Sequence, residues 1–188
     1  MNRQLLVAAA LAVALVGGGA VAEEPLKSGP QVGEMLPGAF RPLNVTNCEK
    51  PEAAGKKNCL VCQYGQCPAI LIFARDVNDP VATLVKKLDP VVAKHRNQYL
   101  SAALIVLSDK EGAEKTLKDL AARQNIKNVS LAVDNPAGPE KYKIARDAEV
   151  TVILYEAHKV KANHAFKKGQ LNDQAIEKIL ADVPKILN

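Results

Sequence analysis

The sequence predicts one α/β domain in which a central mixed sheet is flanked by helices. Continuous apolar runs at residues 69–74 and 102–107 indicate strands that are buried on both faces of a sheet. Helical patterns follow both runs, and a pair of strand-like segments occupies residues 150–166. Alternating strands and helices predict parallel strands joined by crossover helices, and the late pair adds an antiparallel edge.

Little regular structure is predicted for residues 41–68, which precede the first buried strand. A short strand is expected at residues 41–45, and a long loop follows at residues 46–68. That loop contains Pro51, Gly55 and Gly65, and such residues interrupt helices and strands. A helix should begin only after the strand at residues 69–74.

That first helix is expected to start with Asp79 as the N-cap and Pro80 in the first helical position, where its missing N–H is tolerated. Pro90 then kinks the helix or restarts it, because proline breaks the helical hydrogen-bond pattern. The apolar face of the helix contains Val81, Leu84, Val85 and Leu88.

The second helix is predicted after the strand at residues 102–107. Ser108 and Glu111 have the spacing of a capping box, which indicates a helix start. A third strand at residues 129–133 follows, and then a turn at residues 134–139 that leads into a short helical piece.

The C-terminal part predicts a hairpin and a final helix. Strands at residues 150–155 and 159–166 form the hairpin, and Asn172 or Asp173 caps the helix. The buried face of this helix contains Ile176, Ile179, Leu180, Val183 and Leu187.

The N-terminus has the parts of a secretory signal peptide. Residues 1–22 contain Arg3, an apolar run of about 12 residues and the cleavage motif Ala20-Val21-Ala22. An uncleaved membrane anchor is the alternative, but a spanning helix needs roughly 20 apolar residues. We expect cleavage after Ala22 and a periplasmic or secreted protein without a stable membrane anchor. The remainder divides into a tail at residues 23–40 and one domain at residues 41–188.

Composition argues against nucleic-acid binding. The formal net charge is +5, but the basic residues are scattered along the chain rather than gathered in a block. Aromatic residues make up 4% of the chain and tryptophan is absent, so a base-stacking platform is not expected. We therefore predict no nucleic-acid partner.

The order of several motifs resembles the redoxins, the thioredoxin-fold group that includes peroxiredoxins and exported thioredoxin-like reductases. Residues 26–40 (LKSGPQVGEMLPGAF) resemble the redoxin opening, and residues 134–144 (DNPAGPEKYKI) are similar to the thioredoxin segment that ends in KYGI. The strand and helix at residues 102–124 match the redoxin insertion into the thioredoxin core. The resemblance implies a thioredoxin-like fold with a redoxin-type strand–helix insertion.

The sequence departs from that family at the usual redox site. The family places its reactive cysteine after the second strand, where residues 75–80 contain no Cys, Ser or Thr. The family's cis-proline aligns with Val150, and a cis bond before a non-proline residue costs about 3–4 kcal/mol. We expect this bond to be trans and the usual site to be absent.

The four cysteines, Cys48, Cys59, Cys62 and Cys67, lie before the strand at residues 69–74. Three interpretations remain open. Two structural disulfides would staple the long loop, as an even cysteine count in an exported chain favours. Alternatively, Cys59 and Cys62 form a redox pair while Cys48 and Cys67 are structural. In the third interpretation all four cysteines bind Zn²⁺ or Cu(I).

The resemblance implies thiol–disulfide or antioxidant redox chemistry, with Cys59 attacking and Cys62 resolving. Lys56 and Lys57 precede this pair and would favour a thiolate. The expected partner is a protein thiol or disulfide, and no cofactor is expected. The sequence leaves open whether the chain is an enzyme, and it does not predict an oligomeric state. The alternatives are a non-catalytic binding domain with structural disulfides and a cysteine-rich metal-binding protein.

Overall fold

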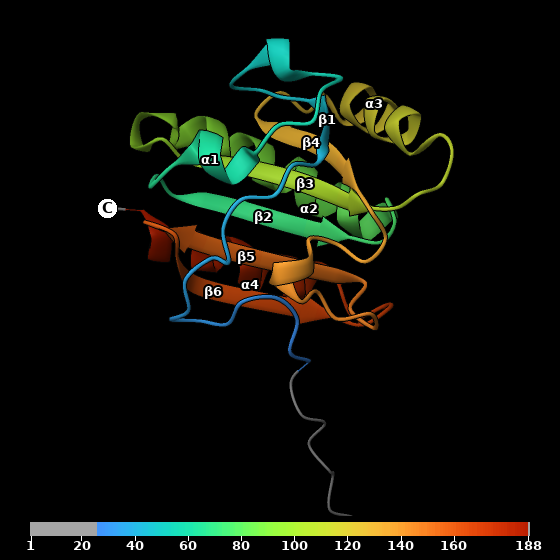
Figure 1. Ribbon diagram of the computed structural model, residues 1–188. Coiled ribbons are helices and arrows are strands. Elements are labelled where there is room, and N and C mark those ends of the chain that lie inside the picture. The colour runs from blue at the N-terminus through green and yellow to red at the C-terminus, as the bar shows by residue number, and fades with distance from the viewer. Residues whose placement is uncertain (1–25, 188) are drawn as a thin grey trace, which may run out of the picture.

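The computed structural model describes residues 26–187, which form a six-stranded mixed sheet with strand order β1-β4-β3-β2-β5-β6 (Figure 1). The parallel strands β2, β3 and β4 lie in the middle, and β1, β5 and β6 run antiparallel to their neighbours. The strands are β1 (Leu43–Thr46), β2 (Ala69–Ala74), β3 (Ser101–Leu107), β4 (Val129–Asp134), β5 (Val150–Glu156) and β6 (Lys159–Phe166). The predicted mixed sheet is confirmed.

Helices cover both faces of the sheet. The short helix α1 and the segment at residues 26–40 lie in front of the sheet in Figure 1, and α2 and α4 lie behind it. The α-helices are α1 (Leu60–Tyr64), α2 (Asp79–Lys94), α3 (Ala113–Gln124) and α4 (Asp173–Asp182). Short 3-10 helices occupy Pro51–Ala53, Arg96–Gln98, Glu140–Tyr142 and Val183–Ile186. The strand and helix predicted at residues 102–124 are present as β3 and α3.

Two apolar cores result, because successive side chains of a strand point to opposite faces. In β2, Ile70 and Ile72 face the core beneath α2, α3 and α4, while Leu71 and Phe73 face the core beneath α1. All six residues of β2 are buried, as its continuous apolar run predicted. The front core is the one that positions the candidate site, since Cys59 belongs to it.

The described part of the predicted tail packs into the front core. Leu36 and Phe40 are buried there, and the Phe40 ring packs edge-on against Tyr142 with ring centroids 5.1 Å apart. The Tyr142 hydroxyl donates a hydrogen bond to the Gly38 carbonyl over 2.8 Å. The predicted signal peptide at residues 1–22 lies outside the described residues, and no described helix has the length and apolarity needed to cross a membrane.

Three local predictions need correction. The predicted loop at residues 46–68 contains α1. Asn78, not Asp79, caps α2, because the Asn78 side chain accepts the Val81 N–H. The prediction of a capping box at Ser108 and Glu111 is wrong. The Ser108 hydroxyl accepts the Lys110 N–H within a turn, and α3 begins only at Ala113.

Pro90 does not restart α2, which runs without interruption from residue 79 to residue 94 with the proline inside it. An internal proline costs about 3 kcal/mol or more, because it lacks the N–H of one helical hydrogen bond. Leu84, Leu88 and Val92 bury the helix against the back core, and burying each such side chain stabilises by about 1.5–3 kcal/mol. Packing therefore outweighs the broken hydrogen bond.

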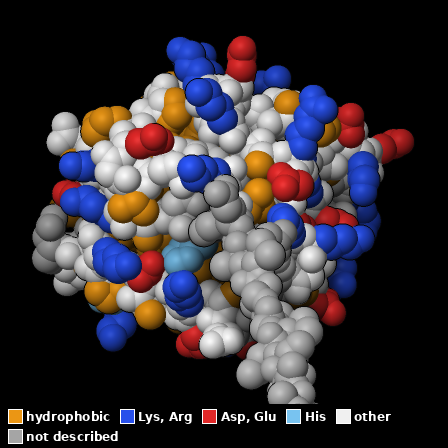
Figure 2. All heavy atoms as spheres, turned by 90° about the horizontal axis from the view of Figure 1, so that it is seen from below, with side chains coloured by type: hydrophobic (Ala, Val, Ile, Leu, Met, Phe, Trp, Pro, Cys, Tyr) orange, Lys and Arg blue, Asp and Glu red, His pale blue; other side chains and the backbone are white. Residues whose placement is uncertain are grey.

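The distribution of surface charge agrees with the scattered basic residues of the sequence. On the face shown in Figure 2, Lys and Arg side chains alternate with acidic and uncharged ones and do not form a continuous stripe. This face offers no extended cationic track of the kind that follows a nucleic-acid backbone.

Candidate functional site

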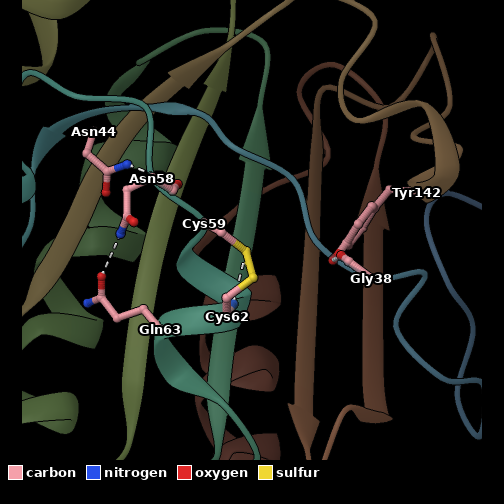
Figure 3. The surroundings of a disulfide bond; sticks show 7 residues. All are labelled: Gly38, Asn44, Asn58, Cys59, Cys62, Gln63 and Tyr142. Atoms are coloured by element: carbon pink, nitrogen blue, oxygen red, sulfur yellow. Dashed lines mark hydrogen bonds between the residues drawn. A yellow bond between two sulfur atoms is a disulfide. The ribbon is translucent and has the colours of Figure 1, made fainter.

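Cys59 and Cys62 form a disulfide at the start of α1 (Figure 3). Their Cα atoms lie 5.3 Å apart. Cys59 is the N-cap residue of the helix, and its sulfur accepts a hydrogen bond from the Cys62 N–H over 3.1 Å. Cys59 is 7% exposed, whereas Cys62 is an exposed residue. An incoming group therefore reaches the disulfide from the Cys62 side.

The helix that carries the disulfide is short, but tertiary contacts fix it on the sheet. Leu60, Val61 and Tyr64 are buried in the front core. The Tyr64 hydroxyl donates to the Ala102 carbonyl of β3 over 3.4 Å. Gly65 ends the helix with a φ of 59°, a conformation that glycine adopts without a steric penalty. Cys62 thus projects from a backbone held at both ends.

A network of amide side chains lies beside the disulfide, and Figure 3 shows three of its members, Asn44, Asn58 and Gln63. The Gln63 Oε1 accepts hydrogen bonds from Asn47 and Asn58 over 2.9 and 3.0 Å. Asn47 also donates to the Asn44 Oδ1 over 3.0 Å, and the fully buried Asn44 donates to the Pro42 carbonyl over 3.1 Å. The network joins α1 to β1 and to the loop before the helix, and it thereby fixes the backbone on both sides of the disulfide.

The disulfide lines an open pocket of about 410 Å³ whose charged side chains are all cationic. Arg41, Lys50 and Lys57 line this pocket together with both cysteines. The remaining lining residues are Asn58 and Gln63. A concentration of positive charge stabilises a thiolate relative to a thiol and attracts anions.

Sequence analysis identified only part of this site. It named Cys59, Cys62 and the cationic Lys57, whereas Lys56 does not line the pocket. It missed Arg41 and Lys50, which lie 18 and 9 residues before Cys59 in the chain. No local motif marks these two residues, because only the packing of β1 and the first 3-10 helix brings them beside the disulfide.

Cys48 and Cys67 are free thiols, so the structure has one disulfide at the four cysteines and not the two that would staple the loop. Both line a second pocket of about 390 Å³, together with Tyr64 and Ser101. Burial raises the pKa of the Cys48 thiol to about 11, and a hydrogen bond to Ser130 acts in the opposite direction. The Cys48 thiol is therefore protonated at neutral pH and is a poor nucleophile.

The four cysteines do not converge on one point. Within residues 26–187, no group of three or more His, Cys, Asp or Glu side chains is arranged to hold a metal ion. Cys59 and Cys62 are joined to each other, while Cys48 and Cys67 line a different pocket. The four-cysteine metal site that the sequence left open is not formed in this structure.

Arg75 lies directly after β2, at the position where the resemblance to redoxins predicts a reactive cysteine. The Arg75 guanidinium follows β2 and donates hydrogen bonds to the carbonyls of Pro136, Ala145 and Ala148, each over 2.9 Å. All peptide bonds of the described residues are trans, which confirms the expectation for Val150. The structure thus has neither the thiol nor the cis bond of the usual site.

No family model matches the sequence, and no curated protein matches it. Solved structures do resemble it. A candidate protein disulfide isomerase from Bacteroides thetaiotaomicron has a TM-score of 0.63 at 15% identity, covering 86% of this chain and 94% of that one. Peroxidoxin BcpB from Mycobacterium tuberculosis has a TM-score of 0.59 at 13% identity, covering 87% and 99%. A secreted disulfide oxidoreductase from the same organism, homologous to Escherichia coli DsbE, has a TM-score of 0.55 at 12% identity, covering 77% and 94%.

These similarities establish the fold. The chain has a thioredoxin-like fold, as the order of its motifs predicted. The proteins that share this fold include a disulfide oxidoreductase and a peroxidoxin. This chain carries a Cys-x-x-Cys disulfide at the start of α1, before β2. Because one fold hosts many functions, the activity has to be argued from the site.

Proposed function

We propose that the protein is an exported thiol–disulfide oxidoreductase whose redox centre is the Cys59–Cys62 disulfide. The observation that carries this proposal is a disulfide with one buried and one exposed cysteine in a pocket whose charged side chains are all cationic. Exchange needs access to one sulfur and a stabilised thiolate on the other. Cys62 provides the accessible sulfur, and the Cys62 N–H together with the cationic pocket stabilises a thiolate on Cys59.

The proposed reaction is a two-step thiol–disulfide exchange. A substrate thiolate attacks the Cys62 sulfur, a new S–S bond forms, and the Cys59–Cys62 bond breaks with its electron pair on Cys59. The Cys62 N–H, 3.1 Å from the Cys59 sulfur, stabilises the thiolate that leaves. A second substrate thiolate then attacks the substrate sulfur of the mixed disulfide and releases Cys62. Two substrate thiols become one disulfide, and their two protons pass to Cys59 and Cys62.

The burial of the two cysteines supports a different order of attack from the one expected from the sequence. The resemblance to redoxins implied that Cys59 attacks and that Cys62 resolves the intermediate. Cys59 is 7% exposed and Cys62 is exposed, so the mixed disulfide should form on Cys62. In the reverse reaction the Cys62 thiolate attacks a substrate disulfide, and Cys59 resolves the intermediate.

Export rests on the sequence. The charged start, short apolar run and Ala20-Val21-Ala22 motif of residues 1–22 favour cleavage after Ala22. The M. tuberculosis oxidoreductase that shares the fold is described as secreted, which is consistent with an oxidising compartment. Disulfides persist in such compartments. The proposed partner is a thiol or disulfide substrate, with no cofactor required.

Turnover by cysteine variants tests the proposal. Purified protein should catalyse thiol–disulfide exchange in a coupled insulin-reduction assay, and Cys59→Ser/Cys62→Ser should abolish this activity. Cys48→Ser/Cys67→Ser is the matched control, because it removes two thiols from the separate pocket and should retain activity. A Cys59→Ser single variant should trap a mixed disulfide on Cys62. Equal activity in both double variants, or none in the wild-type protein, would instead favour a non-catalytic binding domain with a structural disulfide.

A further inference from the structure

We infer that the pocket over the Cys59–Cys62 disulfide selects low-molecular-weight thiols and disulfides that carry carboxylate groups. This inference rests on the proposed function and specifies its substrate class. The pocket is lined by Arg41, Lys50 and Lys57, and no carboxylate lines it. Three positive charges beside one reactive sulfur favour an anionic partner over a neutral or cationic one.

The three cations are not neutralised by the protein. Arg41, Lys50 and Lys57 are exposed, and among residues 26–187 none of them takes part in an ion pair. The carboxylate of Glu49, next to Lys50 in the chain, accepts hydrogen bonds from the Gln63 amide and from the Ser101 hydroxyl. Glu49 lines the neighbouring pocket that contains Cys48, not the pocket of the disulfide. The positive charge around the disulfide is therefore available to a ligand.

The backbone that carries the cations is held in place before a ligand arrives. Lys57 pairs with Leu43 in an isolated β-bridge, and Arg41 lies two residues before Leu43. The Lys50 N–H donates to the Asn47 Oδ1 over 2.8 Å, within the amide network that also fixes Gln63 of α1. Segments separated in the chain are thereby anchored around one pocket. A backbone that is already fixed lowers the ordering cost of binding a ligand.

The size of the pocket points to a small molecule. Its volume of about 410 Å³ falls within the range of roughly 300–1,000 Å³ that small-molecule sites occupy. A small thiol with two carboxylates can place its sulfur at Cys62 and its carboxylates against the cations. An exposed ion pair changes an equilibrium by about 1.5- to 5-fold, so two such contacts, one for each carboxylate, should give a preference on the order of tenfold.

The test compares three thiols of different charge as reductants of the oxidised protein. Glutathione carries a net negative charge, 2-mercaptoethanol is neutral and cysteamine is cationic. Each rate is divided by the rate of the same thiol with hydroxyethyl disulfide, which removes differences in intrinsic reactivity. We expect the normalised rate for glutathione to exceed that for 2-mercaptoethanol on the order of tenfold at low salt, and that for cysteamine by more. The preference should shrink at high salt, where exposed charges are screened.

Charge variants complete the test. In Arg41→Gln/Lys50→Gln/Lys57→Gln the ratio of the glutathione rate to the 2-mercaptoethanol rate should fall close to one. The matched control, Lys86→Gln/Lys94→Gln/Lys118→Gln, removes the same net charge from exposed positions on α2 and α3 and should keep the wild-type ratio. Equal normalised rates for all three thiols would overturn the inference and leave the proposed function standing. A disulfide that reacts with no thiol would refute the proposed function itself.

Discussion

The stability of two cysteine double variants gives a direct test of the disulfide assignment. Cys59→Ser/Cys62→Ser removes a bond that closes a loop of four residues, from 59 to 62. Loop-closure entropy for that length corresponds to about 2 kcal/mol of unfolding free energy. Serine is a good N-cap residue, so its hydroxyl at position 59 can keep the hydrogen bond from the residue 62 N–H. The expected loss of unfolding free energy is therefore only the contribution of loop closure, about 2 kcal/mol.

For a chain of this size, about 2 kcal/mol corresponds to a melting temperature lower by roughly 4–8 °C. Cys48→Ser/Cys67→Ser breaks no covalent bond, because both residues are free thiols, and it should change the unfolding free energy by about 1 kcal/mol or less. Melting curves with and without reductant separate the two cases. Reductant should lower the wild-type melting temperature to that of the Cys59/Cys62 variant, and should leave that variant unchanged. A larger loss in the Cys48/Cys67 variant, or a wild-type protein insensitive to reductant, would refute this assignment.

Three further perturbations test the surrounding structure. Arg75→Ala should lower the unfolding free energy in urea by about 2–3 kcal/mol, because three carbonyl oxygens lose a charged donor; Arg75→Lys should recover less than half of this, and a full recovery would contradict the three-contact geometry. Asp89→Ala should cost about 3 kcal/mol in the same assay, since the Asp89 carboxylate accepts the N–H groups of Lys127, Asn128 and Val129, whereas Asp89→Asn keeps one acceptor oxygen and should cost less. In a Cys59→Ser/Cys62→Ser/Cys67→Ser variant, iodoacetamide should alkylate Cys48 at pH 8 about 100-fold more slowly than an unperturbed thiol, because burial raises the Cys48 pKa from 9.0 to about 11. The raised pKa contributes stability to the folded protein below pH 9, and this contribution is lost as the pH rises toward 11. A labelling rate at pH 8 equal to that of an unfolded control would contradict the burial of the Cys48 thiol.

Much of the sheet could be predicted from the sequence because its strands carry strong signals. The strands at residues 69–74 and 159–166 have the predicted bounds. In the first, every residue is apolar, and in the second, glycine and proline are absent. By contrast, α1 spans five residues, fewer than two turns, so no 3.6-residue period is visible. Its N-cap is a cysteine, which is not among the usual cap residues, and tertiary burial of Leu60 and Val61 supplies the stability that propensity does not.

The candidate site was only partly predictable for a similar reason. The spacing of Cys59 and Cys62 indicates a pair, and the structure joins them. Which sulfur is accessible depends on how α1 lies on the front core, and this orientation cannot be read from the spacing. The contribution of Arg41 and Lys50 depends on hydrogen bonds of Asn44 and Asn47 that connect separate segments. Such contacts leave no periodic pattern in the chain.

The measurement that tests the central claim most directly is the redox equilibrium of the four cysteines. The protein is equilibrated in buffers of stepped ratios of reduced to oxidised glutathione, quenched with acid, alkylated and analysed by mass spectrometry. If Cys59 and Cys62 form the redox centre, this pair passes reversibly from disulfide to dithiol as one two-electron couple, while Cys48 and Cys67 remain alkylatable thiols throughout. A Cys59–Cys62 bond that stays oxidised across the whole series, or a couple formed by Cys48 and Cys67 instead, would contradict the claim.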